Sequence, residues 1–518
     1  MSGQTAIDPA TRFLDRIGAR RWTVSEAWVL VGLFGFVLCL SLAPLGRLLS
    51  EALMPGGNFE LTRLVRLYGE GLVWRATINT LQIAAGATVI AVILGAAMAS
   101  VIAVTDVRGK AAIVFCFILP LMIPPQVSAL AWLQALGPSS TLLGMVDLAP
   151  PPGSPHPLFS MWGIIALLGM HNAPLVFLAT RASMRAVPAD LVDAARSNGA
   201  GPFTTMHTVI LPLASAGLIS GGAIAFVSAA GNFGIQAMLG IPARIPTLIT
   251  LIFQRLSDYG PSVLADAAAL ALGLAVIAIC GLGLQSWLIR RRDLRVTGTG
   301  AQFLEFRLGR WRTPTAVVCW VGIAVVLFIP LGALLTAALV RAYGLPLSWE
   351  TLTFRHFANA LFNHTAIRRA FLTSLSLASM TAVILMLVAI PLGYFLTWRK
   401  SLAIRLLSLS AELSYALPGA VIAIAAILFF LKPLPFIGVS LYGTIWIILA
   451  AYLANRLLLA LRPTVSGFLQ IDRALDEAAR VAGAGFVRSL KDVLLPMVAP
   501  CAAAGAILVF LTALAEIQ

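Results

Sequence analysis

The chain has 518 residues, of which 59% are hydrophobic and only 11% are charged, and its mean hydropathy is +0.94. Because soluble globular proteins carry about 25% charged residues, this composition excludes an ordinary soluble domain. The formal net charge is +15. The arginines lie between hydrophobic runs and not on one basic face, which argues against a nucleic-acid partner and for a membrane topology signal.

Hydrophobic runs long enough to cross a lipid bilayer recur along the chain and predict an all-α polytopic membrane protein. The first run follows four arginines, Arg12, Arg16, Arg20 and Arg21, and predicts an uncleaved helix with the N-terminus in the cytoplasm. With that orientation the cytoplasmic segments, including Arg456 to Lys491, hold most of the 36 Lys and Arg. Eleven spans are predicted: Ala27–Leu49, Ala76–Ala103, Ala111–Leu136, Phe159–Thr180, Leu211–Leu239, Ser262–Ile289, Thr315–Val340, Ala370–Leu396, Leu402–Leu431, Leu441–Leu461 and Leu495–Leu514.

The spans fall into two similar halves. We predict a cytoplasmic N-terminus at 1–26, a first half at 27–293, a basic cytoplasmic linker at 294–312 and a second half at 313–518. Similar halves joined in parallel predict two bundles related by a pseudo-twofold axis, with a path between them. The second half has no counterpart of Ser262–Ile289, so we expect a longer native product with a twelfth helix.

Two polar segments repeat without a gap between hydrophobic runs. The first polar repeat, Asp193–Pro212, reads DAARSNGAGPFTTMHTVILP, and the second polar repeat, Asp476–Pro496, reads DEAARVAGAGFVRSLKDVLLP. Gly199 pairs with Gly483, an offset of 284 residues. The alanine-rich start predicts a short surface helix, and the glycines predict a sharp turn after it. We expect a groove on a cytoplasmic partner to receive each helix, with Glu477 and Arg480 as polar anchors. The alternative is a solvated loop that only joins two spans.

The pattern Glu477-Ala478-Ala479, Gly483 and Leu494-Leu495-Pro496 resembles the cytoplasmic motif of binding-protein-dependent ABC importer permeases of the type I fold. The first copy keeps Ala194, Ala195 and Gly199 but has Asp193 in place of the glutamate. The resemblance covers nearly the whole chain in two tandem copies. It implies that both repeats are coupling helices, each seated on one of two copies of a cytoplasmic ABC ATPase.

The same resemblance implies a periplasmic substrate-binding protein, a bacterial inner membrane and transport by alternating access. The chain contains no GxxxxGK[ST] motif, so we expect it not to be an enzyme and to bind no cofactor. ATP and Mg are expected on the ATPase subunits. A secondary transporter driven by an ion gradient is the alternative of another class. A membrane-embedded enzyme lacks a candidate Ser/His/Asp or metal cluster.

Polar residues inside the predicted spans are candidates for the translocation path, because such residues usually face a bundle interior or a cavity. Hydrogen bonds between neighbouring helices are the alternative. Two helices carry matching breaks, at Pro124-Pro125 and at Pro418-Gly419, which also point to the path. The candidates are Asn79, Gln82, Gln126, His171, Asn172, Asn232, Gln236, Glu412, Ser414 and Tyr415.

The segment GNFGIQAMLGIPARIPTLITLIFQ (Gly231–Gln254) resembles the fused permeases of the iron(III) class, which includes phosphonate relatives. Iron(III) is therefore the favoured cargo, 2-aminoethylphosphonate the second and thiamine a third, since fused thiamine permeases share the architecture. His156, His356 and His364 fall in outer loops but are too scattered for a metal site. In this family the binding protein does most of the substrate selection.

Overall fold

The computed structural model describes residues 24–516 apart from 56–58, 152, 259, 261, 292–304, 343, 400, 434–437 and 439. The four N-terminal arginines, most of the predicted linker and the last two residues lie outside the described residues. The described chain is all-helical, with two isolated β-bridges and no strand, as the sequence predicts. Helices follow from long apolar runs, because a chain in lipid must satisfy its own backbone hydrogen bonds.

In the described residues, eight helices are long and apolar enough to span a membrane, and three bent pairs raise the number to eleven if each pair is one span. Each of the eleven predicted spans overlaps one of these, so the predicted membrane architecture is confirmed. The eight helices are Glu26–Leu53, Gly71–Val104, Met161–Arg185, Val263–Arg291, Gly309–Ala338, Thr365–Trp398, Ile445–Leu469 and Phe486–Leu514. The bent pairs are Lys110–Met122 with Pro125–Gly144, Pro202–Leu213 with Ser215–Ala230, and Leu402–Ala416 with Gly419–Phe430.

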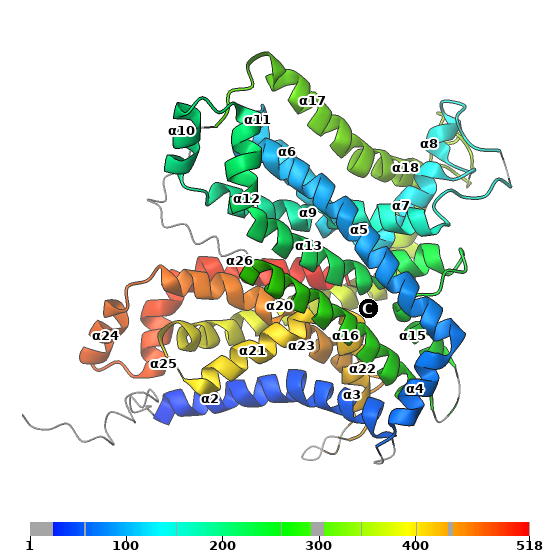
Figure 1. The fold of residues 1–518 in the computed structure, drawn as a ribbon. Coiled ribbons are helices and arrows are strands. Elements are labelled where there is room, and N and C mark those ends of the chain that lie inside the picture. The colour runs from blue at the N-terminus through cyan, green and yellow to red at the C-terminus, as the bar shows by residue number, and fades with distance from the viewer. Residues whose placement is uncertain are drawn as a thin grey trace, which may run out of the picture. The chain divides into compact units, whose positions relative to one another are not determined.

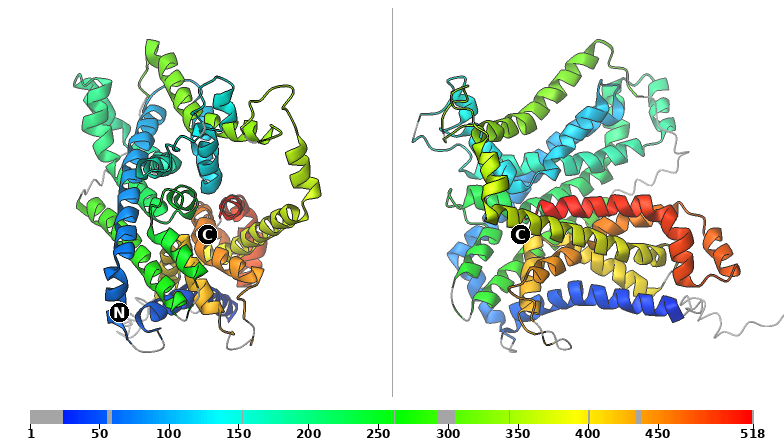
Figure 2. Two further views of the ribbon diagram at one scale, coloured as in Figure 1. Left: turned by 90° about the vertical axis from the view of Figure 1, so that its right-hand side faces the viewer. Right: turned by 180° about the vertical axis from the view of Figure 1, so that it is seen from behind.

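The chain divides into two compact units, and the first combines residues 1–51 with residues 370–516. In this unit α2 packs on α21 and α25 (Figure 1), and α26 runs beside α23 (Figure 2). Its elements are α2 (Val24–Val37), η1 (Leu38–Leu42), α3 (Ala43–Leu53), α20 (Thr365–Trp398), α21 (Leu402–Ala416), α22 (Gly419–Phe430), α23 (Ile445–Leu469), α24 (Ala474–Val481), α25 (Phe486–Ser489), η9 (Leu490–Leu494) and α26 (Leu495–Leu514).

The second unit contains residues 52–369. Here α5, α9 and α13 pack together, while α17 and α18 lie against α6, α7 and α8 (Figure 1). Its elements are α4 (Leu61–Gly69), α5 (Gly71–Val104), α6 (Lys110–Ile118), η3 (Leu119–Met122), α7 (Pro125–Leu136), α8 (Thr141–Gly144), α9 (Met161–Arg185), α10 (Ala189–Ser197), α11 (Pro202–Thr205), η4 (Met206–Ile210), α12 (Leu211–Leu213), α13 (Ser215–Ala230), α14 (Phe233–Ile235), η5 (Gln236–Gly240), α15 (Leu248–Ser257), α16 (Val263–Arg291), η6 (Gly309–Trp311), α17 (Arg312–Ile323), η7 (Ala324–Phe328), α18 (Ile329–Ala338), α19 (Arg355–Ala358) and η8 (Asn359–Asn363).

The two units do not follow the predicted halves along the chain, because the first span of each half packs with the other half's helices. The span Glu26–Leu53 belongs almost entirely to the unit built from the second half, and Gly309–Ala338 belongs to the unit built from the first half. The exchange concerns packing, so the predicted boundaries of the halves, 27–293 and 313–518, stay a prediction about the sequence repeat.

Small residues bring the membrane helices into close contact inside each unit. A Cβ on Gly95 of α5 would lie 2.6 Å from the carbonyl oxygen of Ala173 on α9. In the other unit a Cβ on Gly505 of α26 would lie 2.8 Å from the carbonyl oxygen of Ala460 on α23. Since lipid tails are as apolar as side chains, such close packing is a main source of helix association in membranes. These contacts hold the helices that flank each polar repeat.

Candidate functional site

The two polar repeats have the same backbone. The preceding helix spans Met161–Arg185 in the first half and Ile445–Leu469 in the second, and both boundaries differ by 284 residues. The same offset relates α11 to α25 and the π-helical turn η4 to η9. The predicted short helices are confirmed as α10 and α24, neither of which is a candidate span.

A glycine turn closes each short helix, as the sequence predicts. Gly199 has φ +80° and Gly483 has φ +87°, a left-handed conformation that glycine adopts without a Cβ penalty. The hydrogen bonds around the two turns also match. The amide of Ala200 donates to the carbonyl of Ala195, and that of Ala484 donates to Ala479, both at 3.0 Å. Such C-terminal caps satisfy helix carbonyls that would otherwise lack partners.

The outward faces of the repeats present acidic and apolar side chains at equivalent positions. Asp193 and Ala194 are exposed, as are Glu477 and Ala478, while Ala195 and Ala479 are half-buried. Exposed apolar side chains also occupy equivalent positions in the two repeats. Leu191 (39% exposed) corresponds to Leu475 (40%), and Phe203 (78%) corresponds to Val487 (56%). Exposed apolar side chains on an otherwise polar segment are typical of a protein contact surface.

The inward face of the first repeat is apolar. Val192 is fully buried in a hydrophobic cluster that includes Val107 and Ile113. Arg196 forms an exposed ion pair with Asp193 at 3.4 Å. Its guanidinium also lies 4.1 Å from the ring centroid of Phe306, which belongs to the described end of the basic linker. The first repeat is therefore held by apolar packing and by one cation–π contact.

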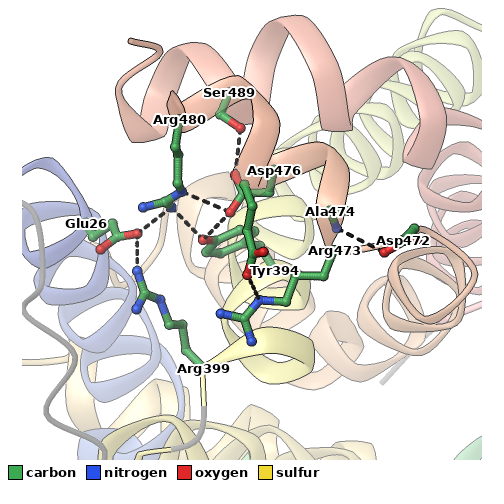
Figure 3. A network of polar contacts seen from close by, with 10 residues as sticks. Glu26, Tyr394, Arg399, Asp472, Arg473, Ala474, Asp476, Arg480 and Ser489 are labelled. Atoms are coloured by element: carbon green, nitrogen blue, oxygen red, sulfur yellow. Dashed lines mark hydrogen bonds and ion pairs between the residues drawn. The ribbon is translucent and has the colours of Figure 1, made fainter. Parts of the chain in front are cut away.

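The inward face of the second repeat is ionic. Asp476, at the position of Val192, is 5% exposed and accepts hydrogen bonds from Ser489 at 2.6 Å and from the Nε of Arg480 at 2.9 Å. Arg480 also donates to Tyr394 and to Glu26, both at 2.7 Å, and Glu26 is fully buried (Figure 3). The arginine expected to face a partner is thus engaged within this chain.

Glu26 joins three distant segments and was not among the predicted site residues. It accepts from Arg480 of α24 at 2.7 Å and from Arg399, just after α20, at 2.6 Å. Burial lowers the pKa of Arg480, but the hydrogen bond to Glu26 and the negative charges of Asp476 and Glu26 outweigh it and raise that pKa above its ordinary value. A buried carboxylate is costly unless paired, so both arginines stabilise Glu26 where it lies.

Three of the predicted path residues gather where the helix after the first repeat breaks. Asn232 caps α14 by accepting from the amide of Ile235 at 3.0 Å, and Asn172 accepts from Ser228 at 2.9 Å. Gln236 is fully buried and donates to the carbonyl of Ala229 at 2.7 Å. Among the described residues the Nδ2 of Asn172 and the Oε1 of Gln236 have no hydrogen-bond partner.

Of four other predicted path residues, one lies beside this break and three lie elsewhere. Gln126 is the second residue of α7 and lies beside the break, where a Cβ on Gly234 would lie 2.9 Å from its Oε1. Asn79 donates to the carbonyl of Pro246 at 2.8 Å, which is a helix-to-loop hydrogen bond. Glu412 and Tyr415 are exposed on α21 of the other unit.

The predicted breaks at Pro124-Pro125 and Pro418-Gly419 are confirmed. The helices before and after them are bent by 104° in the first half and by 112° in the second. Proline removes a backbone donor and clashes with the preceding turn, which accounts for both bends.

A buried charge pair in the second half takes the place of a neutral pair in the first. Arg456 of α23, 4% exposed, donates to the carbonyl of Thr512 at 3.0 Å and forms an ion pair with Glu516. The equivalent positions in the first half are Asn172, Ser228 and Asn232. We counted Arg456 with the cytoplasmic segment, but it lies in the middle of α23, so that assignment was wrong.

Two of the three histidines that we predicted in outer loops contact backbone carbonyls. A ring nitrogen of His156 lies 3.1 Å from the oxygen of Leu133, and one of His356 lies 3.0 Å from that of Val340. Across the described part of the chain, no group of three or more His, Cys, Asp or Glu side chains is placed to hold a metal ion.

Comparison with known proteins places this arrangement among transport proteins. A probable ABC transporter permease protein, y4fN, of Sinorhizobium fredii is 27% identical over 514 residues, which cover 97% of this chain and 87% of that protein. A probable molybdenum ABC transporter permease protein of Haloferax volcanii is 28% identical over 258 residues, 49% of this chain and 90% of its own. The molybdenum transport system permease protein ModB of Azotobacter vinelandii is 29% identical over 183 residues, 34% of this chain and 77% of its own.

The family described as "Binding-protein-dependent transport system inner membrane component" matches residues 91–294 and 389–517. These two ranges include the first and second polar repeats, respectively, and together cover more than half of the chain. The chain therefore belongs to this family of multi-pass ABC importer permeases and carries its domain twice.

Proposed function

We propose that this chain is the translocation subunit of an ATP-driven importer whose two polar repeats each dock on one copy of a cytoplasmic ABC ATPase. The observation that carries the proposal is the equivalence of the two repeats. Their short helices end at equivalent residues, and both repeats present an acidic side chain and two apolar side chains at the same positions. Two identical partner subunits require two equivalent docking surfaces on one chain.

We place the N-terminus and both polar repeats on the cytoplasmic face of a bacterial inner membrane. The distribution of Lys and Arg in the sequence supports this orientation. A periplasmic binding protein then meets the opposite face of the lipid bilayer. No nucleic acid takes part.

The mechanism that follows is alternating access. ATP and Mg bind to the ATPase subunits, which draw together, and the polar repeats transmit this movement to the helices packed on them. Such a transporter needs two arrangements of its helices that ATP and cargo stabilise unequally. We propose that Asn172, Asn232 and Gln236 line the path in the first half, and that Glu412 and Tyr415 line it in the second. Gln126 adjoins the first group, whereas the hydrogen bond of Asn79 to Pro246 favours a packing role.

We propose a metal ion or metal oxyanion as the cargo. The resemblance of Gly231–Gln254 to fused permeases favours iron(III), and the names of relatives in several organisms favour molybdenum. The relative that aligns with 97% of this chain has no cargo in its name. 2-Aminoethylphosphonate and thiamine remain the alternatives among fused permeases.

The decisive experiment measures ATP hydrolysis by the chain in liposomes with its ATPase and its binding protein. The binding protein is added empty or loaded with iron(III), molybdate, 2-aminoethylphosphonate or thiamine. Stimulation by one loaded form identifies the cargo class. Transport of cargo without any stimulation of ATP hydrolysis would contradict the proposed function.

A paired set of variants tests the docking surfaces. Leu191→Asp and Leu475→Asp place a charge on the exposed apolar positions, and each is expected to weaken co-purification of the ATPase. Leu284→Ala, which removes an exposed apolar side chain from α16, is the control. Glu477→Lys separates the importer from a secondary transporter driven by an ion gradient. An importer loses its ATPase and its transport, whereas a secondary transporter keeps transporting.

A further inference from the structure

Both polar repeats carry an arginine at the same position, and each arginine contacts a segment that is distant in the sequence. The guanidinium of Arg196 lies 4.1 Å from the ring centroid of Phe306. The guanidinium of Arg480 donates to Glu26 at 2.7 Å, across 454 residues of sequence (Figure 3). The contacts differ in chemistry, but they use repeat-equivalent arginines.

Phe306 and Glu26 occupy comparable places in the chain. Glu26 begins the span Glu26–Leu53, and Phe306 lies three residues before the span Gly309–Ala338. These are the two spans that pack with the helices of the opposite half. Each polar repeat is therefore joined, through its arginine, to the start of the exchanged span in its own unit.

We propose that Arg196 and Arg480 are positioning residues that tie each polar repeat to the exchanged first span of the other half. A movement imposed on one polar repeat then moves helices from both halves of the sequence together. The inference rests on the proposed function, because it assigns a force-transmitting role to the same repeats that dock the ATPases.

The second tie is the stronger one. Glu26 is fully buried and binds two guanidinium groups, and charge-assisted hydrogen bonds are about twice as strong as neutral ones. Asp476 and Tyr394 hold Arg480 in the orientation that reaches Glu26.

The first tie uses a ring that the backbone fixes in place. Phe306 donates its amide to Val104 at 2.8 Å and accepts from Asp106 at 3.2 Å, and its neighbour Glu305 pairs with Lys110 at 2.5 Å. These contacts hold the backbone of Phe306 against the segment that precedes α6, although the cation–π contact itself is weaker than an ion pair.

The test uses the full chain in liposomes with its ATPase and its binding protein. The variants Glu26→Gln and Arg480→Gln remove the ionic tie, while Glu26→Asp keeps its charge. Phe306→Leu removes the aromatic ring but keeps an apolar side chain, and Phe306→Trp keeps a ring. Arg47→Gln, which breaks an i,i+4 ion pair at the far end of the same N-terminal span, is the control. The measurements are co-purification of the ATPase and the amount of cargo transported per ATP hydrolysed.

We expect normal co-purification of the ATPase with every variant, because the docking side chains are unchanged. Cargo per ATP should fall about tenfold in Glu26→Gln and Arg480→Gln, as loss of a charged hydrogen bond implies. It should fall about twofold to fivefold in Phe306→Leu, the range of an exposed cation–π contact. Glu26→Asp, Phe306→Trp and Arg47→Gln should stay near the wild-type ratio.

An unchanged ratio in Glu26→Gln, Arg480→Gln and Phe306→Leu would overturn the inference. An equal loss in Phe306→Leu and Phe306→Trp would also overturn it, since the effect would then come from packing and not from the ring's charge distribution. If Glu26→Gln fails to fold, the Phe306 pair decides alone. Failure of the wild-type chain to bind an ATPase would refute the proposed function instead.

Discussion

The first and second polar repeats share both boundaries of α11 and α25 and of η4 and η9, yet different chemistry holds their inward faces. Val192 packs in an apolar cluster, whereas Asp476 at the equivalent position accepts hydrogen bonds from Tyr394, Arg480 and Ser489. The exposed positions are alike in both copies. The similar outward faces are consistent with docking on identical partner subunits, as proposed above. The different inward faces each need only to pack within their own unit.

The same contrast recurs deeper in the membrane. The neutral pair Asn172–Ser228 in the first half corresponds to Arg456–Thr512 with Glu516 in the second. The second half thus uses charge at two levels where the first half uses apolar or neutral groups. Because a charge buried in the membrane depends on its partner, the second half should be the more sensitive to single substitutions.

The largest difference is expected for the deeper pair. Arg456→Met leaves Glu516 without its arginine, and removing one partner of a buried ion pair costs about 3–5 kcal/mol of unfolding free energy. The repeat-equivalent Asn172→Ala removes one neutral hydrogen bond, worth about 1 kcal/mol. Thermal unfolding in detergent compares the two. The double variant Arg456→Met with Glu516→Gln should recover much of the loss, and equal destabilisation by Arg456→Met and Asn172→Ala would contradict the contrast.

A smaller effect is expected when the second repeat receives the first repeat's residue. Asp476→Val leaves the hydroxyl of Ser489 and one donor of Arg480 unpaired, so we expect a loss of about 2–3 kcal/mol. The reciprocal change, Val192→Asp, buries a carboxylate in an apolar cluster and should be at least as harmful. Chemical unfolding of both variants measures this. If Asp476→Val were neutral, the ionic network would contribute nothing to stability.

Local sequence patterns predicted the parts of the molecule that depend on neighbours in the chain. The eleven spans follow from apolar runs, and the turns at Gly199 and Gly483 follow from glycine after a short polar helix. The breaks at Pro124-Pro125 and Pro418-Gly419 follow from missing backbone donors. Each of these features is determined within about twenty residues of sequence.

Long-range partners carry no such local signal. Glu26 is an acidic residue in the first turn of α2, and nothing near it in the sequence indicates Arg480 or Arg399. The exchange of first spans also depends on packing between distant segments. Arg456 did carry a signal, because it is a lone charge inside the predicted span Leu441–Leu461, and that signal was missed when it was counted as cytoplasmic.

The two glycine turns have the same conformation, so replacing either glycine by alanine should lower the free energy of unfolding by the same amount. Gly199→Ala and Gly483→Ala each place a Cβ on a residue with positive φ, at a cost of about 1–2 kcal/mol. Neither Cβ would meet an atom within 4 Å, so the cost is conformational in both. Differential scanning calorimetry of the two variants should give the same decrease. Unequal decreases would show that the backbones of the repeats differ in solution, and Gly46→Ala, in open space within α3, is the control.

The smallest effect is expected in the second unit, where the described end of the linker meets the segment before α6. The carboxylate of Asp106 accepts from the amide of Leu308 at 2.8 Å, and this hydrogen bond, with the charges of Arg312 and Lys110, holds the pKa of Asp106 below its ordinary value of 3.8. A lowered pKa stabilises the folded state fully above pH 3.8 and loses that contribution as the pH falls through the lower folded value. Asp106→Asn removes the carboxylate charge at every pH. At neutral pH we therefore expect it to loosen the linker in the same way that protonation of Asp106 at low pH does in the wild type.

The readout for Asp106 is cleavage by trypsin after Arg307 and Arg310, both in the described end of the linker. We expect slightly faster cleavage in Asp106→Asn than in the wild type at pH 7. Phe306→Leu, which leaves the backbone hydrogen bonds in place, should cleave at the wild-type rate while still weakening the contact to Arg196. Faster cleavage in Phe306→Leu than in Asp106→Asn would mean that the ring, and not the carboxylate, fixes the linker. The first repeat would then depend on one aromatic contact as completely as the second depends on Glu26.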